Sequence, residues 1–231
     1  MSAGAFPGTF VAAALIARKD LAIEFRTRSA FLAALVFSML AIVIFYFAWD
    51  PTAVTAGDLA PGVLWVIFTF SGLLGLHRSF GVEQADRAID GLIASPIARE
   101  AIFLGKALAN LAFVLGVQAV AIPAVAMFYN LPIVRVLGPL VMITVLASIG
   151  LVAIGTLFSA MTSNTRLAEL LLPVLALPFF VPIVLPAAQV TARLLAGRPA
   201  MEAISWLRIL IAFDIVFVVA CALAFPFTLE D

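Results

Sequence analysis

Six long apolar segments alternate with short polar stretches along the chain. Most of them reach or exceed the roughly 20 residues that an α-helix needs to cross the hydrocarbon core of a bilayer. Charged residues, prolines and glycines mark their ends, where helices stop and loops begin. The pattern predicts an all-α integral membrane domain over residues 30–231, with transmembrane helices at residues 30–49, 61–76, 101–129, 136–161, 170–188 and 207–227.

The segment before the first span, residues 1–29, has a different pattern. It predicts an amphipathic helix lying in the headgroup region on the cytoplasmic side of the membrane. The apolar residues at helical spacing are Phe10, Ala14, Ala17, Leu21 and Phe25. The basic residues expected to contact anionic membrane lipid are Arg18, Lys19, Arg26 and Arg28. A solvated helix packed on its own protein is the alternative.

A charged loop, residues 81–100, separates the second and third spans. Its charged residues fall three or four positions apart and an apolar edge accompanies them, which predicts a short amphipathic helix. The charged positions are Glu83, Asp86, Arg87 and Asp90, and the apolar edge is Ile89, Leu92 and Ile93. Because a purely solvated loop would not need the apolar edge, we favour an element that docks on a cytoplasmic partner.

Orientation follows from the basic residues near the membrane ends. A cytoplasmic N-terminus places nine of the 13 basic residues inside: Arg18, Lys19, Arg26, Arg28, Arg78, Arg87, Arg99, Lys106 and Arg166. Four are then outside: Arg135, Arg193, Arg198 and Arg208. Both termini are therefore expected in the cytoplasm, although the loop predicted over residues 189–205 carries basic residues outside. Lys106 is expected to extend its side chain from the third span to the interface.

Composition limits the class of protein. With 65% hydrophobic and 11% charged residues among 231, the chain has too little polar surface for a water-soluble globule and no room for an added enzyme domain. Any energy source must therefore come from another chain. The formal net charge of zero gives no global attraction to nucleic acid. A single cysteine, Cys221, excludes an intrachain disulfide.

Two features inside the spans suggest a pathway or an irregular helix. The fifth span carries Pro173, Pro178, Pro182 and Pro186, which remove backbone hydrogen bonds and predict a kinked or re-entrant segment. A kinked packing helix without a transport role is equally compatible. Asp214 is the one acidic residue within a predicted span, so it needs a partner, protonation or an aqueous face. Arg208 and Gln118 are the candidate partners, and both a functional role and a mere interface position stay open.

Several short motifs resemble one family. They are Ala60-Pro61-Gly62-Val63-Leu64-Trp65-Val66, Gly72-Leu73-Leu74-Gly75-Leu76-His77-Arg78-Ser79-Phe80, Asp90-Gly91-Leu92 and Gly105-Lys106-Ala107-Leu108-Ala109-Asn110. Their order is similar to that of the CcmB family, the heme exporter permeases of cytochrome c maturation. The resemblance covers nearly the whole chain, including the charged residues before the first span.

The resemblance implies an ABC-type, ABC-2-like exporter permease in the bacterial inner membrane. It implies a cytoplasmic ABC ATPase subunit that binds the ATP, further membrane subunits of the cytochrome c maturation complex, and a second permease copy. In this family the complex drives release of a heme-loaded periplasmic chaperone, so heme is its cargo. The charged loop would correspond to the coupling region, and the N-terminal helix to the membrane-surface helix.

The sequence shows no dedicated cofactor, metal or catalytic site. Heme iron takes His, Met, Cys or Tyr as axial ligand. The only histidine, His77, lies at the predicted cytoplasmic end of the second span, so we expect it to be an interfacial residue. Competing interpretations are an ABC exporter permease for a lipid, drug or glycan, a passive scaffold, and an intramembrane enzyme. The last would need a second polar group at the depth of Asp214.

Overall fold

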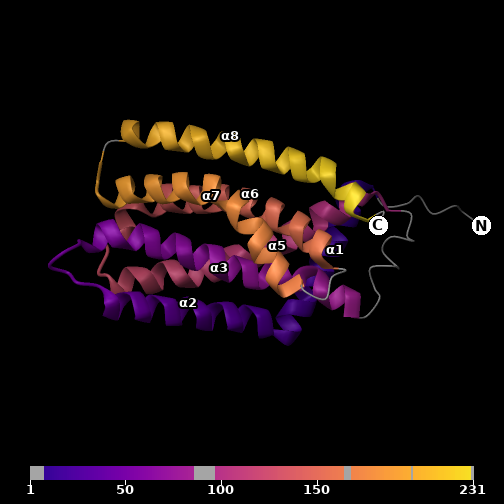
Figure 1. Ribbon diagram of the computed structural model, residues 1–231, viewed down its shortest axis with the longest axis horizontal. Coiled ribbons are helices and arrows are strands. Elements are labelled where there is room, and N and C mark those ends of the chain that lie inside the picture. Colours follow the sequence, from indigo (N-terminus) through magenta and orange to yellow (C-terminus); the bar gives the residue numbers. More distant parts are fainter. Residues whose placement is uncertain (1–7, 86–96, 164–167, 199, 230–231) are drawn as a thin grey trace, which may run out of the picture.

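The computed structural model describes residues 8–85, 97–163, 168–198 and 200–229, which form an elongated bundle of helices (Figure 1). The helices are α1 (Thr9–Thr27), α2 (Ser29–Ala48), α3 (Ala56–Ala85), α5 (Arg99–Phe128), α6 (Leu137–Ser163), α7 (Ala168–Leu195) and α8 (Ala200–Ala224). Two short 3₁₀ segments, η1 (Ile133–Val136) and η2 (Phe225–Leu229), precede α6 and follow α8.

The all-α, six-span prediction is confirmed. Six of the helices, α2, α3 and α5 to α8, are long and apolar enough to cross a membrane. The helices extend further than the apolar segments, because α3 continues to Ala85, α7 to Leu195, and α8 already begins at Ala200. The expected loop at residues 189–205 is therefore wrong over most of its length. Hydropathy marks the edge of the hydrocarbon, whereas a helix can continue into the headgroups as long as its side chains reach water.

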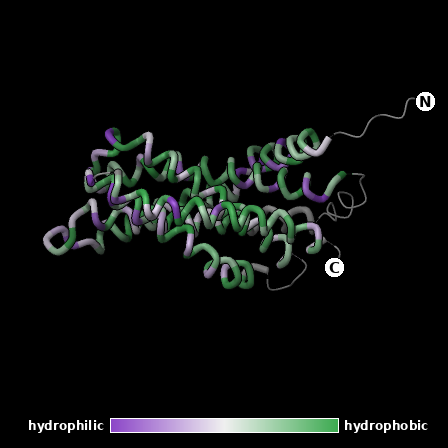
Figure 2. Tube along the Cα trace, turned by 90° about the horizontal axis from the view of Figure 1, so that it is seen from above, coloured by the Kyte–Doolittle hydropathy of each residue, from purple (hydrophilic) through white to green (hydrophobic). Residues whose placement is uncertain are grey.

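The spans divide into central and peripheral helices. In the most apolar stretches of α3 and α6, 72% of the residues are buried, against 22% in α2 and α8. Figure 1 shows α2 and α8 on opposite flanks of the bundle. Hydrophobic residues predominate along all the helices (Figure 2), so the outer faces of α2 and α8 are suited to lipid.

Buried polar side chains join the central helices. The Trp65 indole of α3 donates to the Thr191 hydroxyl of α7 at 3.0 Å. The Gln118 amide of α5 is paired with the Ser148 hydroxyl of α6 at 3.0 Å. Because the hydrocarbon interior offers no water to polar groups, such pairs fix which helix faces meet. Gln118 is thus occupied and is not the partner of Asp214.

The proline-rich fifth span is a single helix. α7 runs through Pro173, Pro178, Pro182 and Pro186 without a break, and residues 170–195 are long and apolar enough to cross. A re-entrant segment is therefore not what the structure contains. Each proline still leaves the carbonyl four residues earlier without its helical donor. Close packing with α3, α6 and α8 holds the helix in place.

An aromatic cluster closes the end of the bundle at which α2 and α5 finish. Tyr46 and Trp49 pack against Tyr129, with ring centroids 5.9 and 5.6 Å apart. The Trp49 indole also donates to the carbonyl of Val54 in the following loop, at 2.8 Å. Tyr and Trp favour the membrane interface, where an apolar ring and a polar tip are both accommodated. This end is opposite the one that carries α1 and η2 (Figure 1).

Candidate functional site

The N-terminal helix is packed on the protein itself. α1 makes its most extensive contacts with α5, and its buried residues are Ala12, Ala13, Ile16 and Ala17. Gly105 of α5 permits the close approach, since a Cβ at that position would lie 2.8 Å from the carbonyl oxygen of Ala13. A small residue in a membrane helix is typical of such contacts, but the sequence does not identify α1 as the partner.

The predicted apolar stripe of α1 is not the face that the protein covers. Phe10 is 81% exposed and Phe25 74% exposed, while Ala17 alone of the stripe is buried. The protein-facing side includes Ala13 and Ile16 instead, because Gly105 has no side chain and leaves space on α5 for the backbone of Ala13 and the side chain of Ile16. α1 therefore has features of both alternatives, a helix packed on its own protein and a membrane-surface helix. One side is packed on α5, and the exposed aromatic residues on another side are free to contact lipid.

All four basic residues assigned to lipid contact are exposed: Arg18, Lys19, Arg26 and Arg28. Arg28 forms the corner between α1 and α2 and has a left-handed backbone with φ of 56°. Glu24 of α1 reaches across the corner, and its carboxylate accepts the backbone N–H of Phe31 at 2.9 Å. This satisfies a free amide in the first turn of α2 and fixes the angle between the helices.

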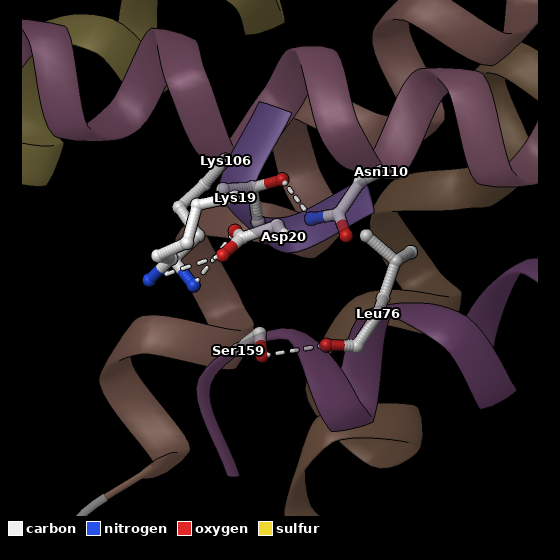
Figure 3. Close-up of polar contacts among 7 residues, drawn as sticks. Lys19, Asp20, Leu76, Lys106, Asn110 and Ser159 are labelled. Carbon is white, nitrogen blue, oxygen red and sulfur yellow. Dashed lines mark hydrogen bonds and ion pairs between the residues drawn. The ribbon is translucent and has the colours of Figure 1, made fainter. Parts of the chain in front are cut away.

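A charge cluster joins α1 to α5. The Lys106 Nζ lies 3.0 Å from Asp20 Oδ2, and only 1% of the Lys106 side chain is exposed. The Lys19 Nζ lies 3.2 Å from the other Asp20 oxygen. Figure 3 shows both amino groups directed at the Asp20 carboxylate. The Lys106 side chain is covered by α1, which also supplies its counter-charge.

Hydrogen bonds place three other elements at the same end of the bundle. The Ser159 hydroxyl of α6 donates to the backbone carbonyl of Leu76 in α3, at 2.8 Å (Figure 3). Arg99, the first residue of α5, donates to the carbonyl of Pro226 in η2 at 3.1 Å. One end of the bundle therefore carries the end of α3, the start of α5, the charge cluster and η2. We call this end the α1 face.

Of the predicted coupling residues, only Glu83 belongs to a described helix. Glu83 belongs to the last turns of α3, and its side chain lies outside what the structure describes. The same holds for His77, further back in α3. The remaining candidates are outside the described residues: Asp86, Arg87, Asp90, Leu92 and Ile93.

Asp214 of α8 lies next to α7, as expected if Asp214 and the prolines of α7 belong to one site within the membrane. It is 4% exposed, and its carboxyl group contacts Gly150 of α6 next to Ile183, the residue after Pro182. Arg208 is on the exposed surface of α8, so neither suggested partner pairs with Asp214. Pro178 lies about one turn before Pro182 in α7, and nothing described links it to the carboxyl group.

No group of three or more His, Cys, Asp or Glu side chains that could hold a metal ion occurs among the described residues. The Lys106–Asp20 pair is the feature that sequence reasoning missed. A lysine within an otherwise apolar helix was the available signal, but its partner is far away in the sequence. Only the packing of α1 on α5 brings the two charges together.

Comparison with known proteins decides the family. A protein-family profile described as CcmB protein matches residues 11–231. The heme exporter protein B of Paracoccus denitrificans is 32% identical over 194 residues, covering 82% of this chain and 86% of that protein. The chain belongs to the CcmB family. The heme exporter protein B of Rhodobacter capsulatus is 31% identical over 180 residues, covering 78% of this chain and 82% of that protein.

The CcmB motifs that carried the resemblance coincide with packing contacts. In the α3 motif, Leu64 and Trp65 are at most 1% exposed. In the α5 motif, Gly105 admits α1 and Lys106 pairs with Asp20, while the Asn110 amide donates to Thr156 of α6 at 3.0 Å. The CcmB signature on α5 is thus, in physical terms, a set of contacts that holds α1 and α6 against one helix.

Proposed function

We propose that this chain is the membrane permease subunit of an ABC-type complex that exports heme, or releases a heme-loaded periplasmic chaperone, for cytochrome c maturation. The observation that carries the proposal is the match to the CcmB family over residues 11–231, with relatives named heme exporter protein B. ATP hydrolysis would take place on a separate cytoplasmic ABC ATPase chain. Other membrane subunits and a second permease copy would complete the complex.

The arrangement at the α1 face supports a coupling role. The charged loop joins α3 to α5, and α5 begins beside η2 and carries α1 through the Lys106–Asp20 pair. A displacement of the loop by an ATPase would therefore reach α1 and α5 together, since buried ion pairs and close helix contacts resist separation. In this mechanism α1 and α5 move together, and the chain itself makes or breaks no covalent bond.

The α1 face would be cytoplasmic. α1, the start of α5 and η2 share one end of the bundle. The positions of the basic residues along the chain favour the cytoplasm for this end. The exposed aromatic and basic residues of α1 would then lie in the inner leaflet with anionic lipid.

Labelling tests this orientation. Single cysteines at Asp86 and at Thr55, introduced with Cys221→Ser, should react with an impermeant maleimide from opposite sides of the membrane. Asp86 should be labelled only in inside-out vesicles and Thr55 only in right-side-out spheroplasts. The buried Cys221 of the unmodified chain gives the background signal. Labelling of both positions from one side would contradict the proposed topology.

Loss of the protein tests the function. Deletion should abolish c-type holocytochromes while leaving the apocytochromes and b-type cytochromes in place, and the intact chain should restore them. Heme staining of membrane and periplasmic fractions measures the result. Normal holocytochrome levels in the deletion would reject the proposal and favour an exporter permease for a lipid, drug or glycan.

A further inference from the structure

Asp214 lies near the middle of α8, and the coupling mechanism gives it no role. Its side chain is 4% exposed, and neither carboxyl oxygen has a hydrogen-bond partner among the described residues. An ionised carboxylate in such a position costs several kcal/mol, so a buried acid without partners needs an explanation.

The carboxyl group of Asp214 lies in a closely packed site between α6, α7 and α8, which we call its seat. Gly150 of α6 lies directly beneath it, and a Cβ at that position would overlap Asp214 Oδ1. The same Cβ would lie 2.7 Å from Ile183 Cδ1 of α7. The carboxyl group of α8 therefore fits against bare backbone of α6, beside an apolar side chain of α7.

The elements packed on α8 bring no compensating charge to this seat within the described residues. α6 contains no ionisable residue. On the described part of α7, Arg193 stacks on the Trp206 ring, 5.6 Å from its centroid. Trp206 precedes Asp214 by eight residues, or about 12 Å along a helix. On α8 itself, Arg208 is exposed to the surroundings of the bundle.

The charged residues of α5 are at the end of the bundle that also carries η2. Arg99 of α5 donates to the carbonyl of Pro226 in η2, twelve residues beyond Asp214 and so about 18 Å along the chain axis if helical. Glu100 neighbours Arg99, and Lys106 pairs with Asp20. η2 contains no ionisable residue. No described cation is thus directed at Asp214, and no metal-binding cluster includes it.

We propose that Asp214 is a proton-binding site, whose neutral carboxyl group allows α8 to pack against α6 and whose ionised form loosens that contact. Protonation removes the charge that the seat cannot compensate, while the shape of the group is unchanged. α8 is a peripheral helix, so its release from α6 needs no rearrangement of the buried α3. Water entering between α6 and α8 during transport would ionise Asp214 and keep the helices apart until a proton returns.

Infrared spectroscopy tests the site in the full chain reconstituted in lipid nanodiscs. At neutral pH the protein should show the carbonyl-stretch band of a protonated carboxylic acid, and Asp214→Asn should remove it. Gly150→Ala places a methyl group in the seat and should also diminish the band, although Asp214 is still present. Gly138→Ala in the same helix meets nothing within 4 Å and should leave the band intact. A band unchanged in Asp214→Asn would overturn the proposal.

The pH dependence of stability is an independent measurement. The packed state holds a proton that the unfolded chain releases, so stability should fall as pH rises. Above about pH 4, where an aspartate of the unfolded chain has lost its proton, the unfolding constant of the intact chain relative to Asp214→Asn should rise with pH, by at most about tenfold per pH unit, until the folded protein releases its proton. The asparagine variant keeps the shape and lacks the titration. Parallel pH profiles of the two proteins would refute a proton held by Asp214.

Discussion

Replacing Glu83, Asp86 and Asp90 together by lysine should release the ATPase subunit and abolish c-type cytochrome maturation. The proposed docking face would change from three negative to three positive charges, and mismatched charge across an interface costs several kcal/mol. Copurification of the ATPase and heme staining of holocytochromes measure the two effects. Because the loop joins α3 to α5, membrane insertion of the variant must be measured alongside.

Two matched changes distinguish coupling from general damage. Glu202→Lys reverses an exposed charge at the opposite end of the bundle, in the first turn of α8, and should leave both readouts unchanged. His77→Ala removes the only histidine and should preserve maturation, since we expect no ligation of heme iron by this side chain. An inserted triple variant that still retains the ATPase would reject the docking face. A severe defect of His77→Ala in an assembled complex would instead place α3 on a heme path.

Asp20→Asn should weaken the packing of α1 on α5 by about 3 kcal/mol, at the lower end of the range for breaking a buried ion pair because Asp20 is partly exposed. Lys106 remains almost completely buried and loses the carboxylate that faces it. Cleavage of α1 by chymotrypsin at the exposed Phe25 should then accelerate by about 100-fold, because proteolysis follows the population of the open form.

The reciprocal exchange, Asp20→Lys with Lys106→Asp, is the decisive control. It restores opposite charges across the same contact and should recover most of the protection that either single change loses. Glu202→Gln removes one partner of the exposed ion pair with Arg198, 3.7 Å apart, and should alter stability by less than about 0.5 kcal/mol. Equal cleavage rates in the intact chain and Asp20→Asn would show that the pair does not hold α1 in place.

The sequence alone was sufficient to predict the membrane-spanning helices and their number. A span of about 20 apolar residues is a local property, and helix formation in lipid satisfies every backbone group within the segment itself. The six spans and the N-terminal helix could therefore be predicted. The motifs around Trp65 and Lys106 were also sufficient to indicate the CcmB family.

Tertiary structure alone decided which faces of these helices meet. The apolar stripe through Phe10 and Phe25 does not identify the face of α1 that packs on α5, because both lipid and protein interiors accept apolar side chains and hydropathy does not distinguish them. The close approach at Gly105, the pairing of Lys106 with Asp20 and the seat of Asp214 on Gly150 all join residues distant in sequence. Each depends on the distance between two helices at one point of contact. The packing of the whole bundle sets that distance, so no local pattern of residues specifies it.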